Sequence, residues 1–234
     1  MGLNNENAHV TGRPWLVFDI ETMPLQDCAR YLTEPIEAPS NWKDAAKIAA
    51  YIEEARRKQL DKAALDLDLC EIAAIGIGLP LESDAQTRQT TSEADILRGL
   101  WSFVRTIQRD GGVLVGFNCL SFDLPILLRR SLYLGVETPS IAVDKYRHDG
   151  VVDVMDILTF SGKVSMRSLG FYCKRFGIPH DDSVDGAQIP ALVAAGAWDQ
   201  VEAHVRADVA ETMALAARIG LIHVPVQEPA AQVA

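Results

Sequence analysis

The feature that most constrains this sequence is an apolar run that ends in two carboxylates. Near the N-terminus, the stretch WLVFDIETMPL puts four apolar residues directly before Asp19 and Glu21. In an extended strand alternate side chains share a face, so these two carboxylates point one way while Phe18 and Ile20 point the other way, into the core. The run therefore predicts a buried strand over residues 14–20 that carries two like charges on one face.

Two carboxylates on one face repel each other at the end of a buried strand. Either the strand leaves the core and enters solvent at this point, or a divalent cation lies between the carboxylates. Hard cations prefer oxygen ligands, and adjacent carboxylates supply them. The strand by itself leaves both interpretations open.

Composition places the chain among globular proteins, because 48% of its 234 residues are hydrophobic. The net charge of −10 argues against a protein that coats nucleic acid by bulk charge, but it is compatible with an enzyme that handles nucleic acid through metal ions. Four cysteines are widely spaced without a CxxC pair, which indicates reduced thiols. The absence of a membrane-length apolar run and of a signal-peptide core favours a cytoplasmic protein without membrane contact.

The order of the apolar patterns predicts a single α/β domain over residues 14–222, with flexible ends at 1–13 and 223–234. Strands are expected mainly in the first half, and helices dominate the second half. The expected strands are 14–20, 70–79, a short one near 88–91, and 113–117. The expected helices are 41–64, 92–107, 124–134, 153–160, 165–176, 187–195 and 198–219.

Local signals predict several helix ends. Asn41 is the expected cap of the helix over residues 41–64, which we interpret as an insertion. Ser92 with Asp95 resembles a capping box, and Gly135 is expected to stop the preceding helix. The inserted helix has an apolar stripe formed by Ile48, Tyr51, Ile52 and Ala55.

Two further acidic positions draw attention. Asp123 follows a predicted strand and stands at the start of a helix, where acidic side chains are favoured without any ligand. His204 and Asp208 lie four residues apart and so share one helix face. Beside them an apolar line faces the core, formed by Val201, Val205, Val209 and Met213. His204 and Asp208 would then lie at the edge of the buried stripe, which suits a cleft; the alternative is a solvated helix with ordinary polar residues.

In their order, three blocks of the sequence resemble those of DEDD-type 3′–5′ exonucleases. The blocks are the DIET strand, the GFN…FD element at 116–123, and the late helix with ADV…T. They resemble in particular the predicted exonucleases similar to the proofreading domain of family B DNA polymerases. The resemblance covers residues 14–219 and includes VVDVMDIL at 151–158 and SLGFYCKRFGI at 168–178. It implies a ribonuclease H-like α/β fold, with a central mixed five-stranded sheet flanked by helices.

The resemblance also implies a metal-dependent 3′–5′ exonuclease that releases nucleoside monophosphates from a single-stranded end, with DNA favoured over RNA as the nucleic acid substrate. It implies two divalent cations, Mg²⁺ or Mn²⁺, which can stabilise both the entering and the leaving oxygen of a phosphoryl displacement. By position, Asp19 would bridge both ions. Glu21 and Asp208 would hold the ion that binds the attacking water, and Asp123 would support the second ion.

His204 departs from both common forms of the third block. One form has a tyrosine four residues before the last aspartate, and the other has a histidine five residues before it. Here the histidine is four residues before Asp208. Histidine suits the orientation or deprotonation of water, and the alternative is a spectator beside ions that activate the water alone. By analogy Thr22, Met23 and Asn118 are expected to bind the substrate, with core packing or a turn as competing explanations.

Three basic clusters are interpreted as solvated helix faces rather than phosphate contacts, namely Arg56-Arg57-Lys58, Arg129-Arg130 and Lys174-Arg175. Asp153 and Asp156 are compatible with helix capping or with a place behind the metal ligands. Other functions stay open: a catalytically silent nucleic-acid-binding or scaffold protein on the same fold, a 3′–5′ exoribonuclease, or an endonuclease. Four carboxylates argue against the silent binder, because negative charge repels phosphate.

Overall fold

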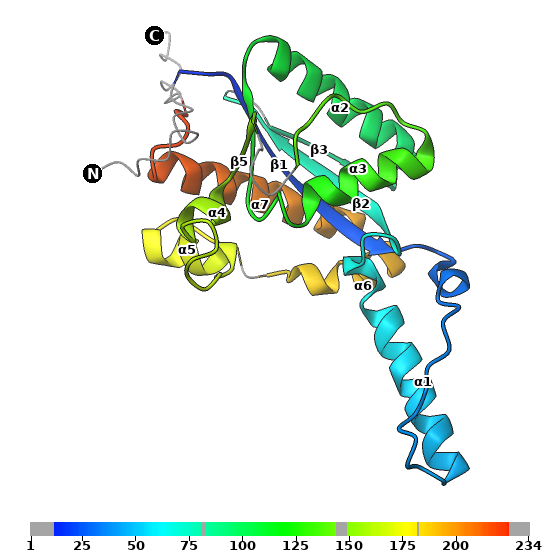
Figure 1. Cartoon of the computed structure of the whole chain (residues 1–234). Helices are drawn as coiled ribbons and strands as arrows, with labels where there is room; N and C mark the ends of the chain where they lie inside the picture. The colour runs from blue at the N-terminus through cyan, green and yellow to red at the C-terminus, as the bar shows by residue number, and fades with distance from the viewer. Residues whose placement is uncertain (1–11, 81–82, 144–148, 182, 225–234) are drawn as a thin grey trace.

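A five-stranded sheet forms the centre of the protein, with strand order β3-β2-β1-β4-β5 (Figure 1). The structure is a computed structural model and describes residues 12–80, 83–143, 149–181 and 183–224. The strands are β1 (Trp15–Pro24), β2 (Cys70–Gly78), β3 (Ser83–Thr87), β4 (Val113–Gly116) and β5 (Val151–Asp153). The pairs β1–β2 and β2–β3 are antiparallel, whereas β4 is parallel to β1 and β5. The expected mixed five-stranded sheet is therefore confirmed.

Helices cover both faces of the sheet. They are α1 (Ala45–Asp61), α2 (Glu93–Arg109), α3 (Asp123–Leu134), α4 (Val154–Leu158), α5 (Leu169–Phe176), α6 (Ile189–Ala194) and α7 (Trp198–Arg218), with short 3-10 turns η1 (Cys28–Tyr31), η2 (Ala63–Leu65) and η3 (Gly186–Gln188). α2 and α3 lie on one face, and α7 lies on the other together with α4, α5 and α6 (Figure 1).

The alternation of β1 divides the core between the two faces. Phe18 and Ile20 belong to the cluster that packs under α2 and α3, as the sequence predicts. Val17 packs in the second cluster, which includes Val209 of α7. Because Asp19 has the same parity as Val17, its side chain lies on the α7 side of the sheet. β1 thus buries two apolar surfaces before it carries the acidic residues.

Small residues on β2 let α7 approach the sheet closely. A Cβ atom at Gly76 would lie 2.8 Å from Cγ2 of Val209 and 3.0 Å from the carbonyl oxygen of Val205. A Cβ atom at Gly78 would lie 2.9 Å from Cγ1 of Val209. Glycine inside a strand often marks such a close approach. The alternation of glycine with isoleucine along β2 therefore determines how near α7 comes to β1.

The first strand is longer than predicted. The expected strand ends at Ile20, but β1 continues to Pro24 because β2 pairs with it as far as Pro24 and Cys70. The register shifts between Glu21 and Thr22, so an irregularity follows directly after the second carboxylate. Asp19 and Glu21 therefore lie within a paired strand and not at its end.

The predicted cap and bounds of the inserted helix are wrong. Asp44 caps α1, and its carboxylate accepts hydrogen bonds from the backbone of Ala46 at 2.9 Å and of Lys47 at 3.1 Å. Asn41 precedes the helix in a turn in which Trp42 N–H donates to a backbone carbonyl. Asparagine and aspartate are both good helix caps, so residue type alone does not distinguish Asn41 from Asp44. Asp44 is the cap because it directly precedes the first helical residue, Ala45.

Helix α1 projects from the body as an arm (Figure 1). Its apolar stripe is only partly covered, since Tyr51 is 39% exposed and packs edge-on against Trp42. The base of the arm is better fixed, because η2 lies against β1 and the Thr22 hydroxyl donates to the carbonyl of Ala64 at 2.6 Å. The arm therefore starts next to the carboxylate-bearing part of β1.

Two further predictions need correction. The short strand expected near 88–91 lies at Ser83–Thr87 instead, where the backbone pairs with β2. Residues 151–153 form strand β5, and the helix expected over 153–160 runs only from Val154 to Leu158. A three-residue strand is too short to produce a periodic pattern, and it forms because β4 offers a free parallel edge.

Most other predicted ends are close to the observed ones. Ser92 caps α2 by accepting from the backbone of Asp95, and Gly135 ends α3 with a φ of 63°. The helix expected from residue 165 begins later, at Leu169, after the cap Ser168. All four cysteines are buried and unpaired, as expected of reduced thiols.

The structure describes little of the two ends of the chain. The stretches expected to be flexible, 1–13 and 223–234, lie mostly outside the described residues. The limits of the single domain therefore stay predictions.

Within the described part of the chain, no helix combines the length and the apolar character that a membrane crossing needs.

Candidate active site

An open pocket of ≈ 580 Å³ lies on the α7 side of the sheet, beside β1. Its floor contains Asp19 and Glu21 from β1. One wall comes from the loop between β4 and α3, and another comes from α7. The third wall comes from the start of α5 and from residues 180, 181 and 184–186. The polar residues that line it are Asp19, Glu21, Asn118, Asp123, Arg167, Ser168, His180, Asp181, Asp185, His204 and Asp208.

The structure brings together the four carboxylates that the sequence singled out. They come from β1, from the first residue of α3 and from the middle of α7. Asp123 is 4% exposed, and its Oδ1 accepts a hydrogen bond from the backbone N–H of Ile20 at 3.2 Å. That bond ties the start of α3 to β1 between Asp19 and Glu21. Residues about 100 positions apart in sequence thus share one site.

Burial and mutual repulsion raise the pKa of these carboxyl groups. Burial raises the pKa of Asp19 well above its usual value, and the charges of Asp123, Glu21 and Asp208 raise it further. Burial also raises the pKa of Glu21, with further contributions from Asp208 and Asp123. The influence of all three neighbours on Asp19 places it centrally among the carboxylates.

Burial also raises the pKa values of the other two carboxyl groups, those of Asp123 and Asp208. Burial raises the pKa of Asp123 to about 7, although backbone N–H groups partly oppose this shift. Burial raises the pKa of Asp208, whereas the charge of His204 opposes that shift. In the described part of the chain, none of the four is ion-paired with lysine or arginine, and the ion-pair partner within reach is His204. The pocket therefore has a strong preference for added positive charge.

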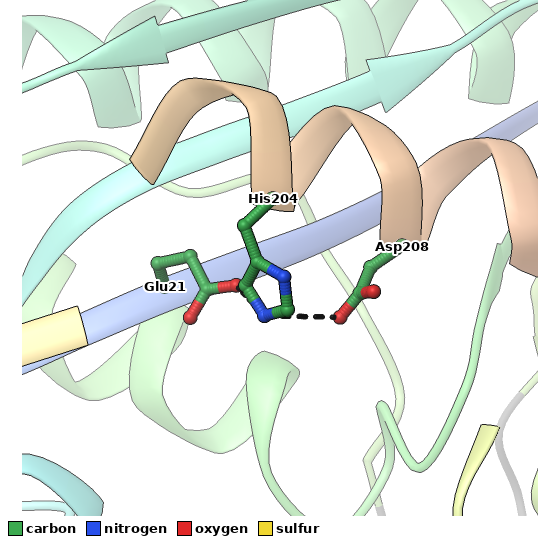
Figure 2. Close-up of side chains that lie close together, drawn as sticks. All are labelled: Glu21, His204 and Asp208. Atoms are coloured by element: carbon green, nitrogen blue, oxygen red, sulfur yellow. Dashed lines mark ion pairs between the residues drawn. The ribbon is translucent and has the colours of Figure 1, made fainter. Parts of the chain in front are cut away.

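The side chains of Glu21, His204 and Asp208 point toward one another (Figure 2). His204 Nε2 lies 3.4 Å from Oε1 of Glu21 and 3.8 Å from Oδ2 of Asp208. One ligand atom from each of these three residues lies within 4.8 Å of the others. The buried valine line of α7 faces the core beside them, so the predicted position of His204 and Asp208 at the edge of a cleft is confirmed.

Asp153 organises the loop that leads to Asp123. Its carboxylate accepts from the backbone N–H of Asn118 at 2.9 Å and of Leu120 at 3.0 Å, and it also caps α4 through Met155 at 2.9 Å. Asn118 has a φ of 61°, in the left-handed region where the chain turns sharply. The sequence indicated a cap or a place behind the ligands for Asp153, and the structure shows that the cap also fixes this loop.

Glu211 links α7 to the outer wall of the pocket, a role that the sequence reasoning missed. Its Oε2 lies 2.7 Å from Nδ1 of His180, and its Oε1 accepts from the backbone N–H of Asp181 at 3.1 Å. The available signal was its spacing, because Glu211 lies three residues after Asp208 on the same helix. No signal in the sequence connected His180 to it, since the contact is tertiary.

The predicted substrate contacts have different surroundings. Asn118 lines the pocket, whereas Thr22 is buried and its hydroxyl bonds to a backbone carbonyl. Met23 is partly buried against the cluster that contains Val201 and Val205. Thr22 and Met23 do not line the pocket in this structure, and substrate contact by any of the three residues stays a prediction.

One basic cluster is not the solvated helix face that was expected. Arg130 is 5% exposed, and its guanidinium donates to both carboxylate oxygens of Glu93, at 2.8 Å and 2.7 Å. Its neighbour Arg129 does lie at the surface, where it pairs with Asp68. The Arg-Arg pair gave no sign in the sequence that Arg130 is buried, because the carboxylate that binds it, Glu93, belongs to another helix.

Residues 67–232 match a protein family described as a predicted 3′–5′ exonuclease related to the exonuclease domain of PolB. The chain belongs to this family. The match includes the blocks with Asp123 and Asp208, and β1 precedes it. A comparison with curated proteins gives no match.

Among solved structures, this protein is similar to the family B DNA polymerase from the hyperthermophilic archaeon Pyrobaculum calidifontis. The TM-score is 0.59 and the sequence identity is 17%, over 89% of this chain but only 24% of the polymerase chain. The ribonuclease H-like α/β fold, with its mixed sheet between helices, is therefore confirmed. At this identity the likeness concerns the fold alone.

The residues of the pocket fit the divalent metal ions that the exonuclease fold generally uses. The donors are carboxylate oxygens and one imidazole nitrogen, and hard divalent cations accept both types. Burial raises the pKa values of Asp19 and Asp123, and no lysine or arginine among the described residues forms an ion pair with either carboxylate. The donor chemistry and the electrostatics therefore agree on a cation site.

Proposed function

We propose that the protein is a metal-dependent 3′–5′ exonuclease that hydrolyses phosphodiester bonds at the single-stranded 3′ end of nucleic acid and releases nucleoside monophosphates. The observation that supports this proposal best is the convergence of Asp19, Glu21, Asp123 and Asp208 in one open pocket, where no lysine or arginine of the described residues pairs with them. DNA is favoured over RNA because the related domain belongs to a DNA polymerase.

The roles proposed for the carboxylates follow from their positions. Asp19 interacts with all three others, so we assign it to both members of a pair of Mg²⁺ or Mn²⁺ ions. Glu21 and Asp208 face each other across His204 and would hold one ion, while Asp123 would support the second. When bound, such ions supply an activated water and neutralise the charge that develops on the phosphate oxygens.

The remaining walls of the pocket suit a polar polymer. Arg167 lies just before α5, on the same wall as His180, and provides positive charge to the pocket of a chain whose net charge is −10. Asn118 presents its amide from the opposite loop. We propose that these side chains contact sugar and phosphate groups of the terminal nucleotides, which orients the scissile bond over the carboxylates.

End-labelled oligonucleotides test the activity. Single-stranded DNA and RNA of the same sequence, labelled at either the 3′ or the 5′ end, are incubated with the protein and Mn²⁺. We expect a 3′ label to appear at once as mononucleotide and a 5′ label to pass through a ladder of shortening products. Asp19→Asn and Asp208→Asn should abolish both patterns while the variants stay folded.

A closed circular single strand separates the competing functions. An exonuclease leaves it intact, so cleavage of the circle would replace the proposal by an endonuclease. Tight binding of linear strands without any release of nucleotides, with either ion, would favour the catalytically silent binding protein. Faster digestion of the RNA strand would reassign the substrate to RNA.

A further inference from the structure

The histidine of α7 occupies the position of a third ligand. His204 Nε2 is the ring nitrogen that lies close to both carboxylates, at 3.4 Å from Glu21 and 3.8 Å from Asp208. Both separations exceed the 2.7–3.2 Å of an ordinary N–H···O hydrogen bond. Nε2 of His204 therefore lies between the two carboxylates without an ordinary hydrogen bond to either, and one ligand atom of each residue lies within 4.8 Å of the others (Figure 2).

The two separations that His204 makes suit donors on one ion. Bonds from a first-row metal ion to nitrogen and oxygen are about 2.1 Å long. Donor atoms 3.4 Å and 3.8 Å apart then subtend angles of about 110° and about 130° at the ion. The first angle lies near the tetrahedral value and the second exceeds it by about 20°, so the side chains would adjust when they bind an ion.

The backbone holds the imidazole in this position. His204 is one turn before Asp208, and the buried residues Val205 and Val209 fix the same turn of α7 against β2. The close approach at Gly76 determines how near the ring comes to Glu21. The side chain of His204 is only 11% exposed, so little conformational freedom is lost when an ion binds.

We propose that His204 is a direct metal ligand, which completes the site of Glu21 and Asp208 and makes it select Mn²⁺ and similar transition ions over Mg²⁺. The inference rests on the proposed function, because it concerns an ion of the same pocket. Imidazole suits transition ions, whereas Mg²⁺ prefers sites built from oxygen donors and water. A nitrogen bound to the ion has no free lone pair, so this role replaces the general-base role expected from the sequence.

Metal affinity gives the first test. The full-length protein is freed of metal, and binding of Mn²⁺ and of Mg²⁺ is measured by calorimetry for wild type, His204→Gln and His204→Tyr. We expect each substitution to weaken Mn²⁺ by at least about 10-fold, comparable to the loss of a supporting residue of a metal site. Mg²⁺ affinity should change by less than about threefold, since Mg²⁺ gains little from nitrogen. Equal loss for both ions, or no loss for either, would overturn the proposal.

The nitrogen can also be observed directly. Electron–nuclear double resonance of the Mn²⁺-loaded protein should show coupling to a ¹⁴N nucleus, which His204→Gln removes. His180→Gln is the matched control, because His180 lines the same pocket from the other wall. Loss of the coupling in the control and its survival in His204→Gln would assign the nitrogen to His180 and reject the proposal.

These measurements separate the two conclusions. Digestion from the 3′ end without nitrogen coupling would keep the exonuclease and reject His204 as a ligand. Nitrogen coupling without digestion of any strand would keep the ligand and reject the nuclease. The binding and resonance experiments need no turnover, so neither outcome depends on the other.

Discussion

At the pocket, the protein deals with buried carboxylates in two ways. Burial raises the pKa of Asp153, but four backbone N–H groups, those of Asn118, Leu120, Met155 and Asp156, donate hydrogen bonds to its oxygens and oppose that shift. Asp19 is surrounded by carboxylates and has a pKa that burial raises well above its usual value. The first arrangement stabilises a fold, whereas the second stores repulsion that a cation can relieve.

We expect this repulsion to appear in the pH dependence of the metal-free protein. The pKa of Asp123 is raised to about 7, whereas an unfolded aspartate titrates near 3.9. Between these values the folded state binds more protons than the unfolded state, so the free energy of unfolding falls as pH rises through this window. The melting temperature in EDTA should therefore be several degrees higher at pH 5 than at pH 7.5.

Asp123→Asn is the variant that isolates this effect. An amide oxygen still accepts the N–H of Ile20 but carries no charge. Metal-free Asp123→Asn should melt above metal-free wild type at pH 7.5 and should lose most of the difference at pH 5. A variant that melts below wild type at both pH values would show that Asp123 stabilises the fold instead of straining it.

Asp153 is expected to act as a positioning residue. Asp153→Asn replaces one acceptor oxygen by an amide donor, so the loop at Asn118 loses part of its support. Because the loop leads to Asp123, we expect metal affinity to fall by about 10-fold, as for other residues that orient ligands. Calorimetry below the melting temperature of the variant measures this metal affinity. Asp156→Asn is the control, since among the described residues its carboxylate bonds to the Ser161 hydroxyl and not to this loop. An equal loss of metal affinity in that variant would refute the assignment.

At the scale of elements, a buried ion pair joins three parts of the fold. Glu93 at the start of α2 binds Arg130 of α3 through two hydrogen bonds, and it also accepts from the backbone of Ile72 in β2 at 2.9 Å. Both side chains are almost fully buried. Removal of one partner would leave the other charge uncompensated, which typically costs about 3–5 kcal/mol.

Urea denaturation can test this pair. Glu93→Gln should lower the free energy of unfolding by roughly that amount, and the double variant Glu93→Gln with Arg130→Met should lose less than the sum of the single changes. Metal affinity of the folded variants should be unchanged, because the pair packs with the opposite face of the sheet. Strictly additive losses would mean that the two residues act independently.

The arm formed by α1 and its flanking residues has a small excess of positive charge in a chain whose net charge is −10. Residues 43–62 contain six lysine and arginine residues and four acidic ones, whereas the chain as a whole has 22 and 32. The arm starts at η2, beside Thr22 and the pocket floor. We expect it to contact the phosphates of a strand that leaves the pocket, although each basic cluster by itself indicated only a solvated face.

Charge reversal tests the arm. Arg57→Glu with Lys58→Glu should raise KM for a long oligonucleotide several-fold and weaken its salt dependence. Hydrolysis of the p-nitrophenyl ester of thymidine monophosphate should not change, because such a small substrate occupies only the pocket. Arg105→Glu with Arg109→Glu is the matched control, since it makes the same charge change on α2, on the other face of the sheet. If both pairs of substitutions changed KM equally, the change would reflect the net charge of the protein and not contact with the arm.

At the scale of the whole molecule, metal binding should couple stability to activity. The chain carries a net charge of −10, and its pocket concentrates carboxylates that neither lysine nor arginine balances in the described part of the chain. An ion that binds only the folded state stabilises it by mass action. We therefore expect EDTA to abolish cleavage and to lower the melting temperature, and excess Mn²⁺ to restore both. Undiminished cleavage in excess EDTA would reject metal-dependent chemistry.

Local patterns in the sequence determined much of this fold. The alternation in β1 placed Asp19 and Glu21 on one face, because side chains alternate in any strand regardless of its partners. Helical spacing placed His204 beside Asp208 in the same way. The cap at Ser92 and the stop at Gly135 are equally local, since each depends on one side chain or on one backbone angle. For such features no distant contact needs to be known.

Only the tertiary structure decided which distant groups meet. β5 is too short to have a pattern and exists because β4 pairs with it, and Arg130 is buried because Glu93 happens to face it. The contact of Glu211 with His180 likewise spans 31 residues. The distance from His204 to Glu21 depends on how closely α7 packs on Gly76, which is a property of two surfaces and not of either sequence segment. The sequence therefore determined which residues are available to the site, and packing decided which of them touch.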